Sequence, residues 1–117
     1  PTNRWVEKYI FPGGYLPTLS EMIGHLPVQD FHIWDVENLG PHYRLTLDEW
    51  SERFERAVPV IREKFDERFV RMWRLYLRGF SASFREGMLE VHQILVSHGK
   101  PGNLSLTRED FYRAEMQ

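Results

Sequence analysis

The sequence predicts an α+β fold that is mainly helical, with one strand before and one strand after a long helical region. Large apolar residues recur at steps of three and four between positions 47 and 84, which is typical of amphipathic helices. Residues 28–36 alternate as a strand does, and residues 88–96 are rich in residues that favour strands. These three observations define the fold class.

Two short helices are expected near the N-terminus. The first covers residues 5–10 and must stop before Pro12, which cannot continue a helix. The second begins at Thr18, because a threonine followed three residues later by Glu21 forms a capping box. We expect this helix to end near Gly24.

The first strand is predicted at residues 28–36. Alternation places Val28, Asp30, His32, Trp34 and Val36 on one face, and Gln29, Phe31, Ile33 and Asp35 on the other. The second face mixes polar and apolar residues, so alternation alone does not say which face is covered.

The long helical region is expected to begin at Thr46 and to divide into two or three helices. Pro59 breaks a helix interior, and Asp66 before Glu67 is a plausible second start. The recurring apolar residues are Leu47, Trp50, Phe54, Ile61, Phe65, Phe69, Met72, Trp73, Tyr76, Phe80 and Phe84.

A glycine stop, a second strand and a short final helix complete the predicted order. Gly87 ends the helical region, and residues 88–96 form the strand. Residues 100–103 read as a turn, and Thr107 caps the last helix.

Length and charge restrict the classes of function. A chain of 117 residues forms one domain with a modest core, and a net charge of −2 without a basic stripe argues against nucleic acid as a partner. There is no cysteine, which fits a reducing compartment, and no apolar run long enough to span a membrane. We therefore expect a soluble cytoplasmic protein.

Local motifs for metal, nucleophile or phosphate chemistry are absent from the sequence. The five histidines show no paired helical spacing, and no serine lies in a Gly-x-Ser-x-Gly context. Gly13 and Gly14 lack the strand–glycine–helix arrangement of a phosphate-binding loop. No metal site and no cofactor-binding residue are predicted.

The segment KYIFPGGYL at residues 8–16 places large hydrophobic residues around a Pro-Gly-Gly turn, where a solvated loop would be polar. Two interpretations are open from composition alone. The segment is a buried loop over a core, or it holds aromatic groups in place for a ligand.

Four ordered blocks at residues 8–22, 36–50, 65–77 and 89–99 together resemble the C-terminal part of the cyclopropane fatty acid synthase family, which includes the mycolic acid cyclopropane synthases. Their most specific parts are the Pro-Gly-Gly turn and the His-Tyr pair at positions 42 and 43. The resemblance covers nearly the whole chain between positions 5 and 99.

The resemblance implies that residues 1–117 are the acyl-chain-binding segment of a doubly wound α/β methyltransferase, whose cofactor-binding part lies upstream and is absent here. In the family the last strand is antiparallel to the one before it. Connection rules alone would predict a right-handed parallel crossover instead. We follow the family and expect two antiparallel strands with helices packed on them.

The activity that the resemblance implies is methyl transfer from S-adenosylmethionine to the cis double bond of a lipid acyl chain. A carbocation forms, and loss of a proton to bicarbonate closes the cyclopropane ring. Tyr43 matches the family's catalytic tyrosine at the bicarbonate site, while the other anion ligands and the cofactor loop lie upstream. Neither cofactor is expected to bind this segment alone. From the residues themselves, a cap on the turn before the helix at Thr46 is the favoured role of Tyr43, and the resemblance reverses that preference.

The resemblance also assigns substrate-binding residues that line an acyl channel. They are Phe11, Leu16, Leu47, Tyr76 and Phe84. Each of them could instead be an ordinary core residue, and Leu47 and Phe84 also fit the helical seam.

A second functional class stays open at this stage, a non-catalytic lipid-binding or interaction module. For either class we expect a lipid acyl chain as partner, contact with the inner membrane surface through that lipid, and a homodimer. The dimer is expected because Phe54, Phe65, Phe69, Trp73 and Phe80 are too many aromatic residues for a small chain to hide.

Overall fold

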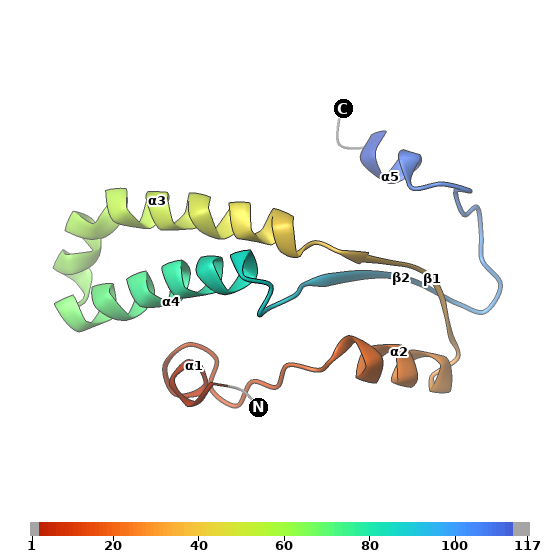
Figure 1. Cartoon of the computed structure of the whole chain (residues 1–117), viewed down its shortest axis with the longest axis horizontal. Coiled ribbons are helices and arrows are strands. Elements are labelled where there is room, and N and C mark those ends of the chain that lie inside the picture. The colour runs from red at the N-terminus through yellow and green to blue at the C-terminus, as the bar shows by residue number, and fades with distance from the viewer. Residues whose placement is uncertain (1–2, 114–117) are drawn as a thin grey trace.

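The computed structural model describes residues 3–113. In chain order the elements are α1 (Arg4–Tyr9), α2 (Leu19–Val28), β1 (Phe31–Asn38), α3 (Gly40–Lys64), α4 (Glu67–Arg85), β2 (His92–His98) and α5 (Glu109–Arg113). The helices α3 and α4 lie side by side, and their open end continues directly into the β1–β2 ribbon (Figure 1). The mainly helical α+β fold is confirmed.

The two strands pair antiparallel, from Phe31 opposite His98 to Asn38 opposite His92. A parallel crossover does not form because α3 and α4 run in opposite directions and return the chain to the end of β1. The register slips between Ile33 and Asp35, so Trp34 is a bulge residue. The predicted single face through residues 28–36 is therefore wrong beyond Trp34.

The N-terminal helices begin as predicted. Asn3 caps α1, and α1 ends before Pro12. Thr18 and Glu21 form the predicted capping box of α2. The predicted end at Gly24 is wrong, because α2 packs against β1 and stays helical to Val28. The first strand consequently begins later than position 28.

The long helical region starts earlier than Thr46 and divides once. α3 begins at Gly40 and passes through Pro59 without a break, although proline removes one helical hydrogen bond. Val58 in the same turn is buried, and burial of apolar surface favours the helix there. The second start is confirmed, since the Asp66 side chain accepts a 2.8 Å hydrogen bond from the amide of Phe69.

The end of the chain also follows the prediction, with shifted limits. Gly87 follows α4 with a φ of 69°, which glycine adopts without strain. The second strand begins at His92 rather than at position 88. Before α5, the Thr107 hydroxyl accepts a hydrogen bond from the amide of Glu109.

The shape of the chain is extended. It measures 53 × 37 × 27 Å, with a radius of gyration of 18.3 Å, where a compact chain of this length would have about 13 Å. The accessible surface is 9394 Å², against roughly 6,700 Å² for a compact protein of this mass. The expectation that helices cover the ribbon holds only for α2, because the α3–α4 hairpin extends beyond the ribbon (Figure 1).

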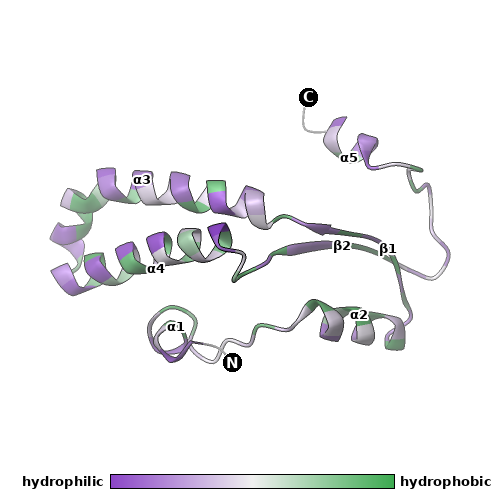
Figure 2. Ribbon diagram, viewed as in Figure 1, coloured by the Kyte–Doolittle hydropathy of each residue, from purple (hydrophilic) through white to green (hydrophobic). Residues whose placement is uncertain are grey.

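Each long helix nevertheless has a polar and an apolar side (Figure 2). The apolar sides of α3 and α4 meet around Leu47, Tyr76 and Leu77, which are all buried. Half-buried apolar residues surround these three. They are Trp5, Ile10, Tyr43, Phe54, Trp73, Phe80 and Phe84. We call these ten residues the aromatic cluster.

Candidate functional site

The aromatic cluster is assembled from three parts of the chain. α3 contributes Tyr43, and α4 contributes Tyr76 and Phe84 at helical spacing. α1 and the turn after it approach α4 from the other side, where Phe11 meets Tyr76. Residues far apart in the sequence therefore form one apolar surface.

Tyr43 lies in the first turn of α3, and its backbone amide donates to the Leu39 carbonyl. Its ring packs edge-on against Phe84, with centroids 5.1 Å apart, and against Trp50 at 6.1 Å. Within residues 3–113 its hydroxyl forms no hydrogen bond. At the start of the helix, the Gly40 amide donates a 2.9 Å hydrogen bond to the side chain of Asn38 and not to Tyr43. The geometry gives Tyr43 no role as a turn cap.

Tyr76 is the most enclosed tyrosine of the cluster, with 5% of its surface exposed. Its ring is surrounded by those of Phe80 at 4.6 Å, Trp73 at 5.5 Å and Phe11 at 5.8 Å. Burial, and to a lesser extent the nearby Tyr43, raises the pKa of the Tyr76 phenol. The phenol stays neutral around pH 7 and can donate a hydrogen bond to an anion.

The predicted site residues divide into two groups. The structure brings Tyr43, Leu47, Tyr76 and Phe84 into the aromatic cluster, and Phe11 contacts it through Tyr76. Leu16 is 65% exposed and lies outside the cluster. Leu47 is completely buried, so in this conformation it supports the cluster from behind and offers no surface to a ligand.

Among the residues that sequence reasoning did not assign to the site, two tryptophans contact it. Trp50 packs on Tyr43, seven residues and two helical turns away, and is 44% exposed. Trp5 joins the cluster from α1. The spacing of Trp50 from Tyr43 was available in the sequence, whereas the contact of α1 with α4 was not.

Next to Tyr43, the Nε atom of Arg44 is buried and has no hydrogen-bond partner within residues 3–113. Arg44 borders an open cavity of about 390 Å³ that is also lined by His42, Phe84 and Arg85. A buried donor without a partner is costly. This corner of the cluster therefore has room for a further polar group.

Among residues 3–113, no group of three or more His, Cys, Asp or Glu side chains could hold a metal ion. In the same residues, no helix is both long enough and apolar enough to cross a membrane. The site consists of aromatic faces and phenols, with no carboxylate among the residues of the aromatic cluster.

A sequence profile described as mycolic acid cyclopropane synthetase matches residues 1–94. The chain is 38% identical over 116 residues to a probable fatty acid methyltransferase of Pseudomonas putida. It is 44% identical over 103 residues to the tuberculostearic acid methyltransferase UfaA1 of Mycobacterium tuberculosis. It is 35% identical over 110 residues to the cyclopropane-fatty-acyl-phospholipid synthase of Escherichia coli.

These matches cover 95%, 86% and 91% of this chain, but only 29%, 24% and 28% of the relatives. The chain thus spans less than a third of their length. Among solved structures, mycolic acid cyclopropane synthase CmaA1, complexed with SAH and CTAB, superposes with a TM-score of 0.77 at 29% identity. The cyclopropane synthase MmaA2 of Mycobacterium tuberculosis gives 0.77 at 28%. Both comparisons cover 80% of this chain and 33% of the other.

Proposed function

This chain belongs to the mycolic acid cyclopropane synthetase family, and on that premise we propose that it is the acyl-chain-binding segment of a lipid methyltransferase. The reaction is methyl transfer from S-adenosylmethionine to the double bond of a lipid acyl chain. The observation that supports the proposal best is the aromatic cluster, which combines aromatic walls with the Tyr43 phenol, a group without a hydrogen-bond partner within residues 3–113.

The aromatic cluster suits this chemistry because aromatic faces exclude water and attract positive charge. When bound, S-adenosylmethionine supplies the methyl group. The double bond would attack that methyl, its electron pair forming the new C–C bond while the methyl–sulfur bond breaks and leaves its electrons on sulfur, so that a carbocation would remain on the acyl chain. Phe11, Tyr76 and Phe84 would surround the acyl chain and stabilise that cation, with Phe11 exposed on one side and Tyr76 buried on the other.

Tyr43 is proposed to act on the anion that takes up the departing proton. Its hydroxyl is free within residues 3–113, so it can donate to a bound bicarbonate, and its ring is fixed by Phe84 and Trp50. The aromatic cluster does not supply the remaining contacts to bicarbonate and to S-adenosylmethionine. The aromatic cluster has neither a glycine-rich turn nor a carboxylate. We therefore assign those contacts to the part of the protein that the relatives have and this chain does not span.

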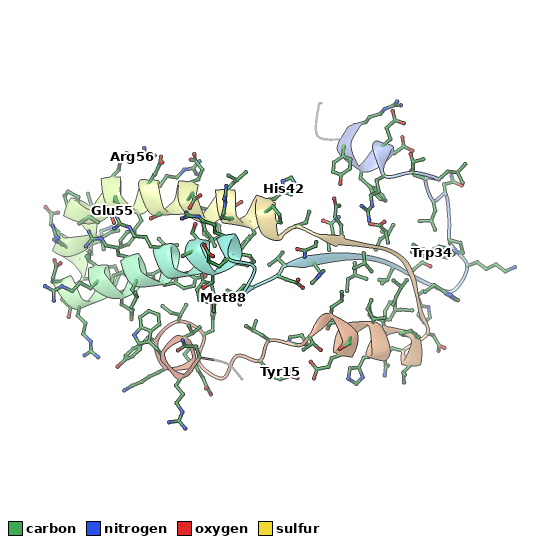
Figure 3. All side chains as sticks on the ribbon, in the orientation of Figure 1. Tyr15, Trp34, His42, Glu55, Arg56 and Met88 are labelled. Carbon is green, nitrogen blue, oxygen red and sulfur yellow. The ribbon has the colours of Figure 1, made fainter. Side chains whose placement is uncertain are left out.

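A substitution of Tyr43 tests this function. In an enzyme that carries this region, Tyr43→Phe keeps the ring and removes the donor, and turnover should fall roughly tenfold to a thousandfold. Lipid binding should change little. Tyr15→Phe is the matched control, since Tyr15 is 71% exposed and its hydroxyl bonds to Glu21 (Figure 3).

Unchanged turnover in Tyr43→Phe would refute the assignment. The alternative, a non-catalytic lipid-binding module, which the apolar cluster also supports, would be favoured if the protein that carries this region bound lipid without any methyl transfer.

The partners and location follow from the same proposal. The accessible surface exceeds that of a compact protein by about 2,700 Å², so we propose that a second copy covers part of it when the segment is alone. Not every aromatic residue expected on that surface is exposed: Phe65 is 54% exposed, whereas Phe54, Trp73 and Phe80 belong to the aromatic cluster. A cytoplasmic location at the inner membrane face would give access to both a water-soluble methyl donor and a membrane lipid.

A further inference from the structure

The surface between α1 and α4 carries cationic side chains that lack acidic partners. The Lys8 ammonium lies 5.0 Å and the Arg68 guanidinium 5.7 Å from the ring centre of Tyr9. Arg68 also donates to the Tyr9 hydroxyl at 3.4 Å. Within residues 3–113, neither cation forms a salt bridge. Their positive charge, that of Lys8 above all, lowers the pKa of the Tyr9 phenol.

Arg71 adds a third cation on the next turn of α4. Its carboxylate neighbour, Glu67, lies 3.7 Å away but is held by Arg62 at 2.7 Å. The Arg71 side chain is 77% exposed. Glu7 and Glu67 are the acidic residues of these two helices near this surface, so cations outnumber them.

Apolar and aromatic residues lie between the cations. Trp5 and Tyr9 face α4, and Leu75 on α4 is 59% exposed. Tryptophan, tyrosine and basic residues together are typical of surfaces that sit in the headgroup region of a membrane.

Two open cavities run along this surface and adjoin at Trp5 and Leu75. The first, of about 270 Å³, is lined by Arg68 and Arg71. The second, of about 250 Å³, is lined by Tyr76 and Phe80 of the aromatic cluster. One end of this groove is cationic and the other is apolar, which matches a lipid with an anionic headgroup and an acyl chain.

We propose that the groove between α1 and α4 is a docking surface for membranes that contain anionic lipid, with the headgroup phosphate against Arg68 and Arg71. The inference rests on the proposed function, because it leads the acyl chain towards Tyr76. Beyond the proposed function, it specifies which face of the molecule contacts the bilayer, and it specifies that this face selects lipids with a negative charge.

The test measures binding of the protein to vesicles in the absence of methyl donor. Vesicles of phosphatidylcholine mixed with phosphatidylglycerol should bind more tightly than vesicles of phosphatidylcholine alone. The preference should weaken at about 1 M salt, where charges are screened beyond roughly 3 Å. Each basic residue near an anionic surface contributes roughly a fivefold change in affinity. The double variant Arg68→Gln/Arg71→Gln should therefore lose about 20- to 30-fold for the mixed vesicles.

The matched control is Arg53→Gln/Arg56→Gln on α3. It removes the same charge from exposed positions, and Arg56 points away from α4 (Figure 3). It should keep most of the affinity. An equal loss in both double variants would show that net charge alone drives binding, and equal binding to both vesicle types would exclude an anionic lipid. Either result overturns the proposal, and neither depends on whether Tyr43→Phe lowers turnover.

Discussion

Replacing Glu55 by glutamine removes the carboxylate that joins α3 to two arginines of α4. One Glu55 oxygen accepts from the Arg74 Nε at 2.6 Å and the other from the second Arg74 nitrogen at 2.9 Å. Arg78 reaches the first oxygen at 3.1 Å. Glu55 lies on the side of α3 that faces α4 (Figure 3). This bidentate pair with a second arginine links the two helices of the hairpin, as the Arg62–Glu67 pair does at their other end.

The expected loss of unfolding free energy in Glu55→Gln is moderate. The side chains of Glu55 and Arg74 are 32% and 30% exposed, so solvent weakens their attraction. Bidentate geometry strengthens it, and we expect Glu55→Gln to lower the free energy of unfolding by about 1 kcal/mol at pH 7.

The effect must depend on pH with a definite sign. Arg74, and after it Arg78, lowers the pKa of Glu55 below its ordinary value of 4.5. A carboxylate with a lowered pKa stabilises the folded state above its unfolded pKa and loses that contribution as the pH falls through its folded pKa. The difference between the protein and Glu55→Gln should therefore be constant above about pH 6 and disappear at lower pH.

Urea denaturation between pH 3 and pH 8, followed by circular dichroism, measures this difference. Glu52→Gln is the control, because Glu52 lies on the same helix and forms no salt bridge within residues 3–113. A difference for Glu55→Gln that persists unchanged at pH 3, or an equal one for Glu52→Gln, would refute the reasoning.

Two further predictions concern the core and the uncovered surface. Leu47→Ala should lower the free energy of unfolding by about 2–5 kcal/mol, because Leu47 is 0% exposed. Leu106→Ala, at a fully exposed position, should lower it by less than about 0.5 kcal/mol. Equal effects of the two substitutions in denaturation would contradict the assigned core. Light scattering at micromolar concentration should give twice the chain mass of 14.1 kDa, and a single-chain mass would exclude the homodimer.

Sequence reasoning succeeded where the deciding interaction is local. Thr18 and Glu21 start α2 through each other, and Asp66 starts α4 through the amide of Phe69. Gly87 ends the same helix because its own backbone angle allows it. In each case the residues that fix the boundary lie within three positions of it.

Sequence reasoning failed where contacts with a distant segment determine the boundary or the pairing of an element. α2 continues past Gly24 because β1 packs against it, and the bulge at Trp34 exists only in the pairing with β2. The strand orientation came from the family resemblance, since connection rules alone favour the parallel arrangement. Within the site, Tyr76 and Phe84 lie at helical spacing on α4 and belong to the same cluster. The exposure of Leu16, in a turn without helical periodicity, was not predictable.

The position of Tyr43 depends on several segments that share no local motif. A Cβ atom at Gly40 would lie 3.0 Å from the Asn38 side-chain oxygen and 3.6 Å from Phe84, so a larger residue at the start of α3 would require the Asn38 side chain to shift. Just before that turn, Arg108 holds β1 by donating to Asp35 at 2.8 Å and to the neighbouring Val36 carbonyl at 3.0 Å. Contacts with α4 and with the C-terminal segment therefore hold the end of β1 and the start of α3 in place. Because residue 108 lies beyond the matched residues 1–94, the family profile does not include this support. The orientation of the Tyr43 ring is therefore a property of the assembled fold, and the His-Tyr pair in the sequence identifies the residue without fixing its geometry.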